Sequence, residues 1–254
     1  MNVAEISSKE EYIQYLFHYI KDNNEIQLTR VLDVPYSAFK SNNNKEEASS
    51  CHPLCNCEKC EALGGFNNDE LSNVNVASID KLTMLHIAAL YNMPKIVSCL
   101  TNHEANVDAQ DCLGNSALHY AASLGYQKVL FLLLHAKSNL NLRNNKQQTP
   151  LILAAMNGHE TCVKALLFFA EHSHSSIEMN AQDEDGLTSL HHSAQCGFEV
   201  IVDILLEYHA KGTIKSTFEK KTPLEDAFNS EIAKKLEDAI KYQVEELPIT
   251  ESEF

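Results

Sequence analysis

The sequence Thr83-Met84-Leu85-His86-Ile87-Ala88-Ala89 is the first of five related copies in this 254-residue chain. The later copies are Ser116-Ala117-Leu118-His119-Tyr120-Ala121-Ala122, Thr149-Pro150-Leu151-Ile152-Leu153-Ala154-Ala155, Thr188-Ser189-Leu190-His191-His192-Ser193-Ala194 and the degraded Thr222-Pro223-Leu224-Glu225-Asp226-Ala227. The intervals between the leucines of successive copies are 33, 33, 39 and 34 residues. A period of this length is typical of a solenoid, in which each repeat packs only against its neighbours.

Each copy predicts two helices joined by a tight turn. The Thr or Ser that begins a copy can cap the first helix, and the small alanines that follow allow close packing. Gly125, Gly158 and Gly197 come after this helix, where a left-handed residue is favoured, and Asn92 takes the same place in the first copy. The second helix carries apolar residues along one stripe. These features predict an all-α protein.

The motif, the turn residues and the period together resemble the ankyrin repeat across roughly residues 75–241. We therefore expect an ankyrin-repeat solenoid of about five repeats, with its C-terminal cap, over residues 75–242. Residues 1–40 are predicted to form an N-terminal helical cap, and residues 243–254 an acidic, disordered tail. The extra residues of the longest interval are predicted to form a polar loop at 172–177.

The charge distribution argues against several classes of partner. The chain has 35 acidic and 20 basic residues, a formal charge of −15, which disfavours binding to nucleic acid. Residues 81–217 hold 12 acidic and 9 basic residues, so the repeat block carries only −3 of that charge.

No apolar run approaches the roughly 20 residues that a membrane span needs, and the N-terminus has no basic, apolar leader. We expect a cytoplasmic monomer that does not insert into membranes.

A cysteine cluster precedes the repeats, within the segment 41–74 that is otherwise predicted to be flexible. Its four thiols follow a C-x3-C-x-C-x2-C pattern and belong to Cys51, Cys55, Cys57 and Cys60. Thiolates this close in sequence can hold one tetrahedral zinc ion, at metal–sulfur distances of about 2.3 Å. Such a site would be structural, because four protein ligands leave no position open for water. Four reduced thiols in a surface loop are the alternative.

A second feature lies on the predicted second helices of repeats two and three. Positions that are normally polar and solvent-facing hold two phenylalanines, with an amide and a cation one turn away on the same faces. These residues are Gln127, Phe131, Lys164 and Phe168. Stacking of the two helices would gather them into one patch, and exposed aromatic groups beside a cation are enriched at protein interfaces. Packing of both phenylalanines into ordinary helix grooves is the alternative.

The cysteine cluster and the repeats together resemble one group of ankyrin proteins, the VARP-like endosomal adaptors. The matching stretches are Cys51-His-Pro-Leu-Cys-Asn-Cys-Glu-Lys-Cys60, Leu124-Gly-Tyr-Gln-Lys-Val129 and Gly158-His-Glu-Thr-Cys-Val-Lys-Ala-Leu166. The resemblance implies that the four cysteines bind a structural zinc ion. It also implies that this zinc knuckle docks onto the phosphoesterase-like subunit of retromer through His52, Pro53 and Leu54.

The same resemblance assigns the patch on the second helices to a Rab small GTPase in its GTP form. The corresponding positions are Gln127, Phe131, Lys164 and Phe168, with Phe131 where the family usually has leucine and Phe168 where it usually has tyrosine. Family members act peripherally at endosomes or lysosome-related organelles. They also carry an upstream Rab-exchange domain, which this sequence does not show, so exchange activity is not expected of it.

The sequence therefore predicts a non-catalytic adaptor in endosomal and lysosomal trafficking. Two segments begin like the metalloprotease motif H-E-x-x-H, at His103 and His159, but Val107 and Val163 stand where its second histidine belongs. The alternative function is a general ankyrin interaction module with an unrelated target, such as an inhibitor of a transcription factor or an enzyme.

Overall fold

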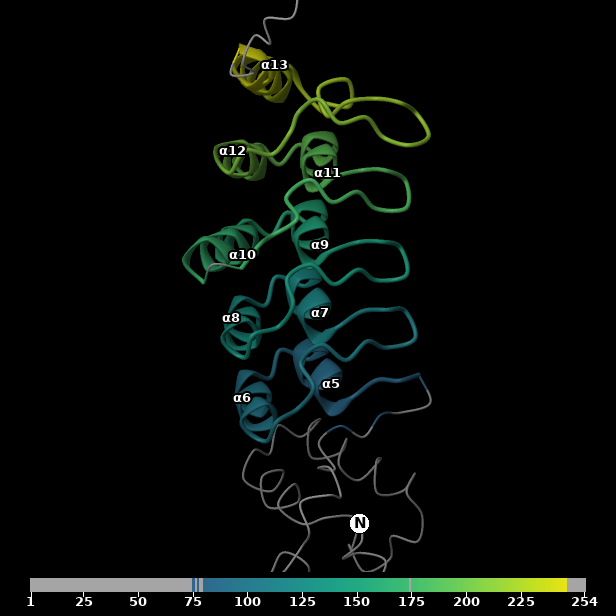
Figure 1. Ribbon diagram of the computed structural model, residues 1–254, viewed down its shortest axis with the longest axis vertical. Helices are drawn as coiled ribbons and strands as arrows, with labels where there is room; N and C mark the ends of the chain where they lie inside the picture. Colours follow the sequence, from purple (N-terminus) through teal and green to yellow (C-terminus); the bar gives the residue numbers. More distant parts are fainter. Residues whose placement is uncertain (1–74, 76, 78–79, 174, 246–254) are drawn as a thin grey trace, which may run out of the picture.

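The computed structural model describes residues 75, 77, 80–173 and 175–245, which form a row of stacked helical repeats (Figure 1). Each of the first four repeats contributes a pair of antiparallel helices. The pairs are α5 (Met84–Leu90) with α6 (Pro94–Asn102), α7 (Ala117–Ser123) with α8 (Gln127–His135), α9 (Pro150–Met156) with α10 (Glu160–His172), and α11 (Ser189–Cys196) with α12 (Glu199–Glu207). The last helix described, α13 (Ser230–Glu245), closes the stack. The predicted N-terminal helical cap lies outside the described residues.

The repeats stack in two columns. Figure 1 shows the first helices (α5, α7, α9 and α11) in one column, the second helices in another, and long loops projecting from the first column on the opposite side. Leucines of both columns, such as Leu118 and Leu134, are fully buried in one continuous core. No β-strand occurs among the described residues, apart from an isolated bridge between Ala77 and Thr83. The prediction of an all-α ankyrin solenoid is confirmed for this part of the chain.

The first helices begin and end as the motif predicts. Thr83 and Thr188 each accept a hydrogen bond from the backbone N–H three residues later, at 3.4 Å in both cases. The turn that follows α9 contains Gly158 at φ 75°, and Gly125 and Gly197 have φ values of 71° and 82°. Each of these glycines therefore occupies the left-handed region, which costs other residues strain.

Three buried histidines join consecutive repeats. The Nε2 atoms of His86, His119 and His191 donate to backbone carbonyls of the next repeat, at 2.9, 3.1 and 3.2 Å. The Nδ1 atom of each ring lies 2.8–2.9 Å from the hydroxyl that caps its own helix. Repeat three has Ile152 at this position, so the junction between repeats three and four lacks the histidine bridge. These three histidines therefore have a structural role.

Burial keeps these imidazoles neutral. It lowers the pKa of His119 to about 4 and also lowers the pKa values of His86 and His191, while the hydrogen bonds to backbone carbonyls oppose the effect only in part. A neutral imidazole with one donor and one acceptor satisfies both of its bonds at the repeat junction.

The long interval between repeats three and four is partly helical: His172, predicted to begin a loop, is the last residue of α10, whereas residues 173 and 175–177 lie outside any helix, as predicted. Helix α10 has 13 residues, whereas α8 has nine, so four of the extra residues extend α10 to His172. The extension continues because Phe169 and Ala170 pack against the core and prolong the apolar stripe. Only the residues that follow α10 form a loop.

The fifth copy is shorter than the others and ends the stack. Its motif at residues 222–227 forms turns instead of a helix, and α13 packs Ile232 and Leu236 into the core. The Gln243 amide accepts from the backbone N–H of Gly212 and donates to the carbonyl of Ala210, at 3.3 and 2.8 Å. These bonds anchor the end of α13, so the helix continues to Glu245, three residues into the segment predicted as tail. Residues 246–254 lie outside the described part.

Candidate protein-interaction face

The four residues predicted to form a partner site lie on two neighbouring helices. Gln127 and Phe131 belong to α8, and Lys164 and Phe168 belong to α10, which packs directly beside it (Figure 1). Gln127 and Lys164 are exposed, and Phe168 leaves 55% of its surface in solvent. Phe131 is half-buried against the core. The two phenylalanines thus differ, because only Phe168 exposes more than half of its surface.

Phe168 owes its orientation to the extra turn of α10. Its ring stacks on the imidazole of His172, with centroids 3.8 Å apart and planes inclined by 27°. The same imidazole bonds through Nδ1 to the carbonyl of Phe168, at 2.8 Å. A large aromatic side chain is therefore held in place on the surface, so binding would cost it little conformational entropy.

A second aromatic contact continues this surface toward α8. The ring of His135, at the end of α8, lies 6.1 Å from the ring of Phe169 in α10, at a tilted angle. His135 is exposed, whereas Phe169 is half-buried. We use the term outer aromatic face for the surface made by Gln127, Phe131, His135, Lys164, Phe168, Phe169 and His172.

The cation of this face is already paired within α10. The Lys164 ammonium group contacts the Glu160 carboxylate one turn before it. Both side chains are largely exposed, so this i,i+4 pair contributes only a few tenths of a kcal/mol, roughly 0.3–0.5. Lys164 can exchange Glu160 for an acidic group of a partner at little cost.

Sequence reasoning missed His135, His172 and Phe169 as members of this face. An aromatic residue followed four positions later by histidine occurs at Phe131/His135 and again at Phe168/His172. This spacing places both rings on one side of a helix and could have identified the pairs. His172 falls in the segment predicted as a loop, because the repeat period alone does not reveal the extra helical turn.

The predicted zinc ligands Cys51, Cys55, Cys57 and Cys60, and the predicted contact residues His52, Pro53 and Leu54, lie outside the described residues. Within residues 80–173 and 175–245, no three His, Cys, Asp or Glu side chains converge where a metal ion could bind. The same part of the chain has no helix long and apolar enough to cross a membrane.

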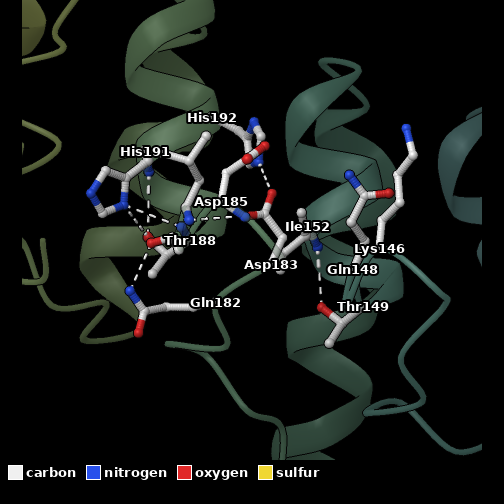
Figure 2. Close-up of polar contacts among 12 residues, drawn as sticks. Lys146, Gln148, Thr149, Ile152, Gln182, Asp183, Asp185, Thr188, His191 and His192 are labelled. Carbon is white, nitrogen blue, oxygen red and sulfur yellow. Dashed lines mark hydrogen bonds and ion pairs between the residues drawn. The ribbon is translucent and has the colours of Figure 1, made fainter. Parts of the chain in front are cut away.

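A buried contact between a histidine and an aspartate in repeat four is structural rather than part of a binding site. His192 Nε2 lies 2.8 Å from Asp183 Oδ2, and Figure 2 shows the two side chains pointing toward each other between α11 and the preceding turn. Burial alone would raise the pKa of Asp183, but hydrogen bonds from His192 and from the backbone N–H groups of Leu187 and Asp185 outweigh it and lower the pKa. The contact between His192 and Asp183 holds the preceding turn against α11. In repeat two, the hydrogen bond that the Tyr120 hydroxyl donates to Asp111 has the same role.

Comparison with known proteins agrees with this architecture. A family model described as "Ankyrin repeats (3 copies)" matches residues 41–144 and 127–216. The chain belongs to the ankyrin-repeat family. Ankyrin repeats generally serve as non-catalytic protein-interaction modules, and the described repeats have the form of such a module.

Several curated ankyrin-repeat proteins are similar to part of the chain. Human Rabankyrin-5 is 29% identical over 163 residues, which is 52% of this chain and 14% of Rabankyrin-5. Inversin from Canis lupus familiaris is 31% identical over 134 residues, 52% of this chain and 12% of Inversin. The probable E3 ubiquitin-protein ligase XBOS32 from Oryza sativa subsp. japonica is 36% identical over 89 residues, 35% of this chain and 18% of the ligase. The chain thus matches less than a fifth of each relative.

Proposed function

We propose that this ankyrin module is a monomeric, non-catalytic adaptor of endosomal and lysosomal trafficking, which binds a GTP-loaded Rab GTPase through the outer aromatic face. The observation that carries the proposal is Phe168, an exposed aromatic ring held by His172 next to α8. Preorganised aromatic groups of this kind are common binding hot spots. The similarity to Rabankyrin-5, whose name refers to a Rab, supports the choice of partner.

Substituting Phe168 by aspartate should weaken Rab binding at least tenfold, because truncation of a hot-spot aromatic costs about 2 kcal/mol or more. Phe131→Asp should also weaken binding. Unlike Phe168→Asp, it should in addition destabilise the fold, because Phe131 is half-buried. Pull-downs with GTP-loaded and GDP-loaded members of a Rab panel would measure both effects. Val200→Asp is the matched control, because Val200 is a 49% exposed apolar residue of α12, outside the face. Equal binding of both nucleotide states, or unchanged binding by Phe168→Asp, would contradict the proposal.

We further propose that Cys51, Cys55, Cys57 and Cys60 hold one structural zinc ion, and that His52, Pro53 and Leu54 contact the phosphoesterase-like subunit of retromer. The spacing of the four thiols supports the zinc ion. Together with the Rab contact, this would place the protein peripherally at endosomes or lysosome-related organelles.

Freshly purified protein should contain about one zinc ion per chain, because a single tetrahedral site uses all four thiolates. Replacing the four cysteines by serine should abolish the zinc content and retromer binding. The melting temperature of the repeats should stay the same, since the cysteine cluster precedes the first repeat in the sequence. Atomic emission measures the metal, and less than half an equivalent would argue against the knuckle.

A second candidate is a general ankyrin module with an unrelated target. It is favoured by the similarity to Inversin and to a probable ubiquitin ligase, whose names do not refer to a Rab. Phe168→Asp and the Rab panel separate the two candidates. A target captured independently of Phe168 and of nucleotide state would support this second function.

A further inference from the structure

Two imidazoles of the outer aromatic face have a fixed proton position. His135 Nδ1 lies 2.7 Å from the carbonyl oxygen of Phe131, and His172 Nδ1 lies 2.8 Å from that of Phe168. A carbonyl oxygen can only accept a hydrogen bond, so Nδ1 of each ring must carry the proton. In the neutral form of such a ring the opposite nitrogen, Nε2, carries no proton and can only accept.

Both Nε2 atoms belong to exposed side chains at the ends of neighbouring outer helices. The part of the chain that the structure describes supplies no hydrogen bond to either atom. The buried histidines of the repeat junctions differ, because their Nε2 atoms donate to the next repeat. The outer aromatic face therefore combines aromatic rings with two outward acceptors, while its own cation is paired with Glu160.

The Nδ1 bond alone does not define a binding site. His103, after α6, bonds to the carbonyl of Cys99 in the same way, at 2.8 Å, and this contact satisfies a carbonyl at the helix end. Two observations set His172 apart from His103. Its ring stacks on the most exposed aromatic side chain of the outer face, and it lies on the extra turn of α10.

We propose that His172 and His135 contact the partner directly, as the hydrogen-bond acceptors of the outer aromatic face, so that the partner surface must present donors beside an apolar patch. This inference rests on the proposed function and deepens it, since it specifies what the GTP-loaded Rab must offer. Suitable donors are hydroxyl, amide or guanidinium groups. A guanidinium group fits best, because it can donate to Nε2 and also stack on the adjoining ring.

The variant His172→Phe tests this inference, because it keeps a ring to stack on Phe168 and removes the Nε2 acceptor together with the Nδ1 bond to the Phe168 carbonyl. Its affinity for the GTP-loaded Rab should fall about fivefold, the loss expected for one hydrogen bond. His172→Ala removes the stack as well and should bind more weakly still. His103→Phe is the matched control, since it loses the same helix-end bond outside the face and should bind like wild type. Unchanged or tighter binding by His172→Phe would overturn the inference and leave the Rab proposal intact.

A second measurement does not need the partner. Long-range ¹H–¹⁵N correlation spectra at neutral pH should show His135 and His172 as Nδ1–H tautomers. Assignment of either ring as the Nε2–H tautomer would overturn the inference, whatever the Rab result. If wild-type protein binds no Rab in either nucleotide state, the proposed function fails and the inference fails with it.

Discussion

Replacing Gly158 with alanine should lower the free energy of unfolding by about 2–5 kcal/mol, the sum of a left-handed backbone penalty and an overpacking penalty. Gly158 has a φ of 75°, and a Cβ atom there would lie 2.8 Å from Cζ of Phe198, in the next repeat. The ring cannot easily retreat, because Phe198 packs against the core between α11 and α12. Urea denaturation followed by circular dichroism would measure the loss.

A double-mutant cycle separates the two penalties. In a Phe198→Ala background the ring is absent, so the added cost of Gly158→Ala should fall to the backbone term of about 1–2 kcal/mol. If Gly158→Ala costs the same with and without Phe198, the contact between glycine and ring is not responsible for the destabilisation.

Lowering the pH from 7 to 5 should destabilise the repeats, with about 2 kcal/mol of the loss due to His119 alone. The pKa of His119 is about 4 in the folded protein and near 6.5 when it is unfolded. Between these values the unfolded chain binds a proton that the folded chain does not. The stabilising contribution is therefore complete above pH 6.5 and is lost as the pH falls toward 4. His86 and His191, whose pKa values are also lowered, act in the same direction.

The natural sequence of repeat three provides the matched control. His119→Ile copies Ile152 into repeat two and should flatten the pH dependence by about 2 kcal/mol between pH 7 and 5. Ile152→His should make the pH dependence steeper. The lowered pKa of Asp183 affects stability only at more acidic pH, because its ordinary value is 3.8. A pH profile of His119→Ile identical to that of wild type would show that this imidazole is not the acid-sensitive group.

Much of the fold could be predicted because every repeat follows the same local rules. The Thr or Ser cap and the left-handed glycine are each determined by residues a few positions apart, and the structure confirms them. The boundaries that were wrong depend on contacts between distant residues. The extra turn of α10 depends on Phe169 packing against the core, and the end of α13 depends on Gln243 reaching Ala210 and Gly212.

The candidate site was predictable only in part for the same reason. The helical faces of Phe131 and Phe168 follow from periodicity, but periodicity does not predict that Phe131 is half-buried whereas Phe168 is 55% exposed. The stacking of His172 on Phe168 could not be predicted while residues 172–177 were assigned to a loop. The zinc knuckle, its retromer contact and the Rab contact remain predictions, each with its own experiment above.

The contacts that join neighbouring repeats limit how such a protein can be rearranged. The glycine of each turn needs a matching side chain from the following repeat: His159 lies over Gly125, and Phe198 lies over Gly158. Each bridging histidine likewise needs a carbonyl of the following repeat. The repeats are therefore not interchangeable cassettes. A recombined array should fold if it keeps together the facing surfaces of the two repeats at each junction. An array cut between those two surfaces would combine surfaces that do not match.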